Sequence, residues 1–357
     1  MITTKNSIKT KFNDINEKSL YFIVDIGANH NGSLEKAIDL IHLAKESGAN
    51  AAKFQNFAAS TIVSQHEFDK MPSMTHQAQW KKSVYEVYDD ASISLDWTEK
   101  LKDACDDVGI DYFTSPYDLQ AVDHVSNYVE IFKIGSGDIT WLEVIEYIID
   151  KEKPIILATG ASDLDDVVRA MGLINKKKAP HVLMQCNTNY TGSINNFNFI
   201  NLNVLTKYSE IFPESILGLS DHTPGHATVL GSIALGARVI EKHFTDDQDQ
   251  DGPDHKFAMT PTDWREMVDR SNELLSSLGD GNKKIEKNEE QSFSVQRRSV
   301  CCIRDVKSGH VIKESDLCYL RPFLNDSFHP YQKDELIGKT IIRDLVQGQS
   351  IKKDFIC

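Results

Sequence analysis

Residues 21–26 read Tyr-Phe-Ile-Val-Asp-Ile, and the loop Gly-Ala-Asn-His-Asn-Gly follows at residues 27–32. Residues 34–46 then place apolar side chains three and four positions apart, which predicts an amphipathic helix. Seven further short apolar runs alternate with helical segments along the chain, at residues 51–55, 110–114, 130–134, 154–158, 181–185, 216–219 and 238–242. Eight consecutive strand and helix pairs predict a (β/α)8 TIM barrel.

The competing fold is an open, doubly wound sheet. Runs that are apolar on both faces suit parallel strands covered by helices, which both folds contain. The barrel is favoured because eight consecutive units fit one closed sheet, and no Gly-x-Gly-x-x-Gly motif follows the first strand.

The composition changes after Leu278. Gly-Asp-Gly-Asn-Lys-Lys and a charged stretch to about residue 291 predict a linker. We therefore expect a polar N-terminal arm at residues 1–19, a barrel at 20–280, a linker at 281–296 and a small, mostly β domain at 297–357.

Charge and hydropathy exclude several classes of function. The 357 residues include 39 basic and 53 acidic side chains, a net charge of −14, and nucleic-acid binding needs a basic face. No run approaches the ~18 apolar residues of a membrane helix, and the start is polar, so we expect a soluble, cytoplasmic protein. Six cysteines without a Cys-x-x-Cys pair predict reduced thiols, not disulfides or a zinc site.

Polar residues follow all eight predicted strands, at the end of a TIM barrel where active sites form. His222 and His243 occupy corresponding positions on strands seven and eight, where two imidazoles can share one divalent ion. Two ligands with open positions suit a Lewis acid that polarises a carbonyl. Hydrogen-bonded structural histidines are the alternative.

Lys53 and Lys133 lie on strands two and four, where a buried ammonium group requires a negative partner. With the glycines and hydroxyls around them, they favour an anionic substrate. The alternative is that each lysine pairs with a carboxylate inside the barrel, such as Asp25 or Glu241.

The loop at residues 245–255 is dense in carboxylates but lacks the spacing of an EF-hand, so calcium is not expected. Its first part, residues 246–251, is typical of solvated surface. Gly252-Pro253-Asp254-His255 instead predicts a rigid turn that directs a carboxylate over the barrel mouth.

Several of these stretches together form longer motifs. In chain order they are Ile-Gly-Ala-Asn-His-Asn-Gly (26–32), Lys-Phe-Gln (53–55), Lys-Ile-Gly-Ser-Gly (133–137), Leu-Ser-Asp-His-Thr (219–223), Glu-Lys-His-Phe-Thr (241–245) and Gly-Pro-Asp-His (252–255). This set resembles the sialic acid synthase family, which condenses phosphoenolpyruvate with an N-acylated hexosamine such as N-acetylmannosamine to form nonulosonic acids. Residues 297–357 are similar to the family's antifreeze-like (SAF) domain, so the resemblance covers about residues 20–357.

The resemblance implies a role for each matching residue. His222 and His243 would hold a divalent metal, manganese first, with Mg²⁺ and Co²⁺ as alternatives. Asp25 would stand beside the reacting carbons, and Arg321 would reach from the SAF domain into a partner's barrel, which implies a domain-swapped homodimer. Phosphate would leave by cleavage of its bond to carbon. The expected phosphoenolpyruvate contacts are Lys53, Ser115, Lys133, Ser136 and Ser220, and the expected acceptor contacts are Gln55, Tyr190 and Asp254.

Four departures from the family pattern concern the substrates. Asp25 stands where the family has glutamate, Ala158 replaces a serine, Thr188 stands where the N-acetylneuraminate enzymes have asparagine, and Phe323-Leu324-Asn325 follows Arg321-Pro322 in place of a glycine-containing turn. The acceptor sugar therefore stays open between N-acetylneuraminate, legionaminic and pseudaminic acid synthases, with Gly-Pro-Asp-His disfavouring the last. Outside the family, the alternatives are a metal-dependent aldolase on the same barrel and a non-catalytic sugar-binding or ice-binding protein.

Overall fold

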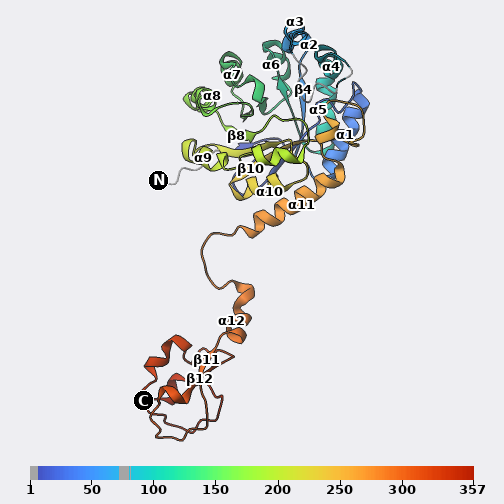
Figure 1. Ribbon diagram of the computed structural model, residues 1–357. Coiled ribbons are helices and arrows are strands. Elements are labelled where there is room, and N and C mark those ends of the chain that lie inside the picture. Colours follow the sequence, from blue (N-terminus) through green and yellow to red (C-terminus); the bar gives the residue numbers. More distant parts are fainter. Residues whose placement is uncertain (1–6, 72–79, 81) are drawn as a thin grey trace. The chain divides into compact units, whose positions relative to one another are not determined.

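The computed structural model describes residues 7–71, 80 and 82–357. The chain forms two compact units, Met1–Gly279 and Asp280–Cys357, and each is described by itself (Figure 1).

The first unit is built on a curled sheet of eight strands. Neighbouring strands are parallel, in the order β5-β4-β3-β10-β9-β8-β7-β6, and β5 also contacts β6, so the sheet approaches closure. The predicted TIM-like fold and all eight predicted strands are confirmed. Their bounds are β3 Tyr21–Asp25, β4 Ala51–Asn56, β5 Asp111–Pro116, β6 Phe132–Ile134, β7 Ile155–Ala158, β8 His181–Cys186, β9 Ile216–Asp221 and β10 Ala237–His243.

Helices surround the sheet because each buries one apolar face against it. In α1 the buried residues are Ala37, Leu40, Ile41 and Ala44, the three- and four-residue spacing of an amphipathic helix, and the Ser33 side chain caps its first turn. The main helices are α1 Leu34–Glu46, α5 Trp97–Val108, α6 Leu119–Val125, α7 Leu142–Ile149, α8 Leu164–Lys177, α9 Val204–Ile211, α10 Ala227–Ala234 and α11 Pro261–Ser277. In its described residues, the long connection from β4 to α5 holds three more, α2 Ala59–Ile62, α3 Gln65–Phe68 and α4 Val84–Ala91.

The expected polar arm contains a short antiparallel hairpin of β1 Ile8–Lys9 and β2 Asp14–Ile15. Ile8 and Ile15 are each 1% exposed and belong to the main core. Their neighbours bind the buried carboxylate of Asp111: Thr10 Oγ1 donates to it at 2.6 Å and Asn13 Nδ2 at 2.8 Å. Because Asp111 begins β5, the hairpin covers the amino ends of the strands, opposite the expected site.

The second unit has its own small core around the antiparallel pair β11 Ser299–Cys302 and β12 Leu317–Leu320. Isolated bridges and short 3-10 helices complete it. The stretch expected to be a linker contains helix α12 Glu290–Gln296. The Phe323 backbone N–H donates to the Ser294 carbonyl oxygen of this helix at 2.8 Å, which attaches the helix to the second unit. In the described part of the chain, no helix is long and apolar enough to cross a membrane.

Replacing Asp111 with alanine should destabilise the first unit. The Tyr21 hydroxyl donates to the same carboxylate at 2.8 Å, so the change leaves three donors without their acceptor, a cost of about 1–3 kcal/mol. Urea unfolding followed by circular dichroism measures the loss. Asp123→Ala is the control, because Asp123 is exposed and its contacts with Lys151 and the Tyr147 hydroxyl lie at the surface, so its loss should change little. Equal midpoints for both variants would contradict the role of the hairpin.

Candidate active site

A buried ion pair fixes the two strand ends that carry the histidines. Lys242 lies opposite Asp221 in the β9–β10 ladder, and Lys242 Nζ is 2.5 Å from Asp221 Oδ2. Thr228 on α10 donates to the same oxygen at 2.7 Å, so the pair lies between the sheet and that helix. Since strand side chains alternate, the next residues, His222 and His243, point the other way, into the barrel mouth.

The predicted site residues of the first unit come together in one cavity. It has a volume of about 440 Å³ at the carboxyl ends of the strands. Its lining includes Asp25, Lys53, Gln55, Ser115, Lys133, Ser136, Tyr190, Ser220, His222, His243 and Asp254. Arg321 lies outside this group, exposed on the second unit.

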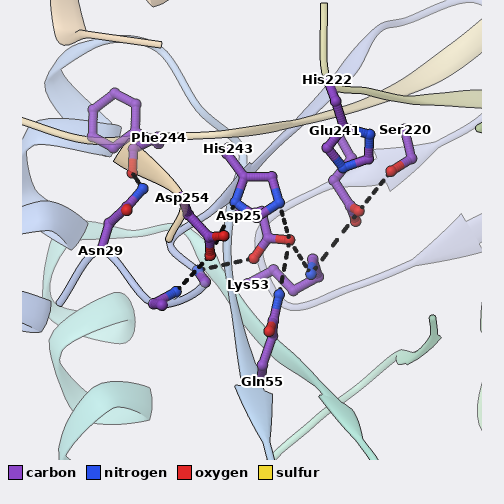
Figure 2. Close-up of polar contacts among 12 residues, drawn as sticks. Asp25, Asn29, Lys53, Gln55, Ser220, His222, Glu241, His243, Phe244 and Asp254 are labelled. Atoms are coloured by element: carbon purple, nitrogen blue, oxygen red, sulfur yellow. Dashed lines mark hydrogen bonds and ion pairs between the residues drawn. The ribbon is translucent and has the colours of Figure 1, made fainter. Parts of the chain in front are cut away.

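Both lysines are paired with carboxylates inside the barrel, as the alternative interpretation of the sequence expected. Lys53 Nζ is 2.5 Å from Asp25 Oδ2, and Lys133 Nζ is 3.0 Å from Glu241 Oε1 (Figure 2 shows the first pair and Glu241). A 4.0 Å contact from Lys53 to Glu241 links the pairs into one chain of charges. Each ammonium group has three N–H donors, so pairing leaves donors for a substrate anion.

These contacts keep both carboxylates ionised. Burial by itself raises the pKa of Asp25, but Lys53, His243 and Lys133 outweigh it and hold that pKa below its usual value. Glu241 behaves in the same way, with burial opposed chiefly by Lys133 and then Lys53. The cavity floor therefore carries two positive and two negative charges.

Three buried polar atoms at this floor have no hydrogen-bond partner among the described residues: Ser115 Oγ, Glu241 Oε2 and His243 Nδ1. A buried polar group without a partner costs free energy, so such atoms mark positions where a ligand atom is expected. From its sequence position Glu241 was expected only as a counter-ion for lysine, although a place near the end of β10 predicts that its side chain lines the cavity.

The two imidazoles lie close enough to share a ligand. Their ring centroids are 5.4 Å apart, and both rings contact aromatic neighbours, Tyr190 against His222 at 4.6 Å and Phe257 against His243 at 4.9 Å. His222 Nδ1 is 2.8 Å from the Asn187 carbonyl oxygen, which assigns the proton to Nδ1 and leaves Nε2 as a lone-pair donor.

These two nitrogen ligands fit a divalent ion. Within the described ranges, no group of three or more His, Cys, Asp or Glu side chains is arranged to hold a metal. Two histidines would therefore need water or substrate oxygens to complete the coordination shell, which is the open arrangement of a catalytic site.

A network of hydrogen bonds holds the Gly-Pro-Asp-His turn over the cavity. Asp254 Oδ2 accepts from the Ala28 backbone N–H at 3.0 Å and lies 3.7 Å from His243 Nδ1 (Figure 2). His255, fully buried, bridges Thr245 Oγ1 at 2.7 Å and Asn31 Oδ1 at 3.0 Å. The turn therefore projects the Asp254 carboxylate into the mouth.

The structure adds lining residues that sequence reasoning did not select, among them Asp138, Tyr117 and Cys186. Burial raises the pKa of Asp138 to about 6. Burial also raises the pKa of Cys186, but hydrogen bonds with His222, Ser136 and Ser220 outweigh it and lower the pKa overall. Cys186 ends β8, Tyr117 directly follows β5, and Asp138 lies in the short 3-10 helix after β6, so their positions near strand ends could have identified them, but none carries a distinctive motif.

Known proteins match this chain along nearly its whole length. The NeuB family matches residues 40–283, and the SAF domain matches residues 297–356. The N,N'-diacetyllegionaminic acid synthase of Campylobacter jejuni is 32% identical over 94% of this chain and all of its own length. The pseudaminic acid synthase of the same species is 30% identical over 94% of this chain and 96% of its own.

A solved structure has the same architecture. The N-acetylneuraminic acid synthetase of Leptospira borgpetersenii, crystallised with citrate, matches with a TM-score of 0.70 and 25% identity. The match covers 81% of this chain and 95% of that one.

The raised pKa of Asp138 predicts a pH-dependent stability. In the unfolded chain this carboxyl loses its proton near its ordinary pKa of 3.8, but in the folded chain it keeps the proton up to pH about 6. Between these values the folded state binds more protons, so the free energy of unfolding falls as the pH rises. Asp138→Asn should therefore gain stability relative to the parent protein between pH 4 and 7.

Urea unfolding at steps of half a pH unit measures this difference. Asp123→Asn is the control, because a hydrogen bond from Lys151 lowers the pKa of Asp123 below its ordinary value of 3.8, so this carboxyl is ionised in both states and the difference from the parent should stay flat between pH 4 and 7. A difference between Asp138→Asn and the parent that stays flat from pH 4 to 7 would show that Asp138 titrates normally.

Proposed function

Because the chain belongs to the NeuB family, we propose that it is a nonulosonic acid synthase that condenses phosphoenolpyruvate with an N-acylated hexosamine and releases phosphate. The observation that carries the proposal is the single cavity in which paired lysines, two close imidazoles and unpartnered polar atoms meet. This set of side chains suits a substrate with two anionic groups, a phosphate and a carboxylate, bound beside an aldehyde.

Phosphoenolpyruvate would bind across the floor of the cavity. Lys53 and Lys133 offer their remaining N–H groups to its phosphate and carboxylate, and Ser115 Oγ gains the hydrogen bond that it otherwise lacks. Ser136 and Ser220 lie in the same lining, although each already has a partner: Ser136 Oγ accepts from the Gly160 N–H, and Ser220 Oγ donates to Glu241.

His222 and His243 would hold a divalent ion, with Mn²⁺ as first choice and Mg²⁺ or Co²⁺ as alternatives. The lone pair on Nε2 of His222 and the unpartnered Nδ1 of His243 support this assignment. When bound, such an ion supplies Lewis acidity toward the acceptor aldehyde. Gln55, Tyr190 and Asp254 would contact the acceptor from the surrounding walls.

The enol carbon C3 of phosphoenolpyruvate forms the new bond to the aldehyde carbon, whose oxygen takes up a proton. Positive charge develops at C2, where the ionised Asp25 carboxylate stabilises it. Because Lys53 keeps the pKa of Asp25 low, this carboxylate acts by its charge and by orienting water rather than as a strong base. Water adds to C2 and releases one proton, which balances the proton taken up by the aldehyde oxygen. The bond from C2 to the phosphate oxygen then breaks, the remaining hydroxyl proton passes to the departing phosphate as the C2 keto group forms, and both lysines stabilise the departing charge.

The test of this proposal is phosphate release from phosphoenolpyruvate in the presence of N-acylated hexosamines and Mn²⁺. With ¹⁸O in the bridging position of phosphoenolpyruvate, the label should end in inorganic phosphate. Label kept in the keto acid would show attack at phosphorus and contradict the C–O cleavage. Condensation of free pyruvate with no phosphate released would instead indicate an aldolase.

Removal of the metal should abolish turnover. Excess EDTA should stop phosphate release and Mn²⁺ should restore it, while His222→Ala and His243→Ala should lose bound metal and keep the fold. Elemental analysis and circular dichroism measure both properties. Full activity in EDTA, with no metal detected, would exclude the metal site.

Asp25→Asn should lower kcat far more than it weakens phosphoenolpyruvate binding, because the charge is needed after the carbon–carbon bond forms.

Arg321 would complete the site from a second copy of the chain, in a domain-swapped homodimer. Mixing His243→Ala with Arg321→Ala chains should then restore activity, since the mixed dimer has one intact site. Complete random exchange would give about a quarter of the parent activity. His222→Ala mixed with His243→Ala is the matched control and should restore none. Demonstrated subunit exchange without recovery in the first mixture would disprove the trans arrangement.

A further inference from the structure

Two cysteines of the second unit lie directly opposite each other. Strands β11 and β12 pair in antiparallel register, with Cys301 opposite Cys318, and both thiols are free. Residues directly opposite in an antiparallel pair project their side chains from the same face. Neither cysteine belongs to the cavity in which the reaction is proposed, so the proposed function leaves this pair unexplained.

The backbone hydrogen bonds define the geometry of the pair. The Ile303 N–H donates to the Asp316 carbonyl oxygen at 2.9 Å, two residues along the ladder from Cys301 and Cys318. Hydrogen-bonded pairs occur at every second position of an antiparallel ladder, so the two cysteines also form a hydrogen-bonded pair. The Cα atoms of such pairs are about 5.5 Å apart, inside the range of about 4.4 to 6.8 Å found in disulfides. The strands therefore already hold the two cysteines at bridging distance.

A third cysteine, Cys302, is directed away from this pair. Its N–H donates to the Gln349 carbonyl oxygen at 3.0 Å, and its side chain is 2% exposed in the core of the second unit. Burial raises the pKa of the Cys302 thiol to about 11, so very little of it is thiolate at neutral pH. Of these three thiols, only those of Cys301 and Cys318 share a face of the strand pair.

The two thiols differ in their access to solvent. Cys301 is 1% exposed, whereas Cys318 is half-buried, so a reagent from solvent reaches Cys318 first. Burial and the neighbouring Cys301 raise the pKa of Cys318, and its reaction is therefore faster in mildly alkaline solution. Cys301 then lies behind it in the position of a resolving thiol.

The same two strands hold the turn that carries Arg321. Ser299 lies two residues before Cys301 on β11, and its hydroxyl donates to the Pro322 carbonyl oxygen at 2.9 Å. The Leu324 N–H donates to the same hydroxyl at 3.3 Å. A change in the spacing of β11 and β12 at the cysteines is therefore transmitted to this turn.

A bond between the two cysteines would produce such a change. Opposite Cβ atoms are about 5.5 Å apart in the wider, hydrogen-bonded pairs, but a disulfide needs about 3.5 to 4.5 Å. Closure would therefore draw the strands together by about 1 Å. Strained disulfides are also more easily reduced, which favours a reversible bond over a permanent one.

We propose that Cys301 and Cys318 form a reversible redox site, which a low-molecular-weight disulfide closes to an intramolecular disulfide and a thiol reopens, and that closure displaces Arg321. The Cys318 thiolate attacks one sulfur of the small disulfide and releases one thiol. The Cys301 thiolate then attacks the Cys318 sulfur and releases the second thiol. The protein gives up two protons and two electrons, and the two released thiols carry them. Only the effect on Arg321 rests on the proposed function.

The first experiment detects the bond in the full chain. The protein is incubated with oxidised glutathione at pH 8.5, alkylated, digested with trypsin and analysed by mass spectrometry without reduction. Trypsin cuts between the two cysteines, at Arg304, Lys307 and Lys313, so a bond joins two peptides that would otherwise separate. We expect the joined peptides, lighter by two hydrogen atoms than the sum of the free ones, and their loss after dithiothreitol. Glutathione held on Cys318 with no joined peptides would overturn the proposal.

Variants and fragmentation identify the partner of Cys318, because Cys301 and Cys302 fall in one tryptic peptide. Cys301→Ser should lose the joined peptides and keep glutathione on Cys318, whereas Cys302→Ser should retain them. Fragmentation of the joined peptides from the parent protein locates the bond without any substitution. A bond from Cys318 to Cys302 would overturn the assignment. Cys357→Ser, which changes an exposed thiol, is the control and should leave the result unchanged.

The second experiment tests the effect on Arg321 through phosphate release with N-acylated hexosamines. Oxidation should raise the KM for the acceptor several-fold, dithiothreitol should reverse the increase, and Cys318→Ser treated in the same way should show none. An unchanged KM with the bond demonstrated would disprove the coupling to Arg321. A chain that forms the bond but releases no phosphate under any condition would contradict the proposed function and leave the redox site in place.

Discussion

The chain of four buried charges at the cavity floor is the interaction on which the site depends. Lys53, Asp25, Glu241 and Lys133 come from β4, β3, β10 and β6, so their pairing requires four strands of the curled sheet in the correct register. Removing one partner would leave a buried charge uncompensated, a cost of about 3–5 kcal/mol. The arrangement therefore couples the geometry of the site to the closure of the sheet.

This electroneutral floor also shapes how an anion can bind. Two unpaired lysines would attract any anion, but here each lysine keeps a carboxylate, and the unpartnered atoms Ser115 Oγ and Glu241 Oε2 add directional contacts. A ligand must therefore place its polar atoms opposite these two atoms as well as carry a negative charge. The same lysine that orients Asp25 also keeps it ionised, which favours an electrostatic role for that carboxylate.

Periodicity predicted the fold well because strand and helix repeats are local properties of the sequence. All eight strands were identified, and the cavity gathers the predicted residues of the first unit because barrel topology brings strand ends together. The pairing of Lys53 with Asp25 was left open, since it depends on register between strands. The raised pKa of Asp138 was also beyond prediction, because burial comes from the whole fold. The hairpin around Ile8 and Ile15 was missed because a pair of two-residue strands gives almost no periodic signal.

The structure suggests why the motifs define a reaction class more firmly than a sugar. Residues that act on the reacting atoms lie at strand ends, where the sheet fixes both spacing and direction, and such positions produce compact motifs such as Ser-Asp-His-Thr. Another part of the cavity lining comes from the connection between β4 and α5, whose short helices are joined by loops, and loops tolerate changes in length and sequence. Side chains such as Val87 and Ile62 contribute there by their apolar surface, a property that many residue types share. This part of the lining can therefore change in sequence while the charged floor stays the same.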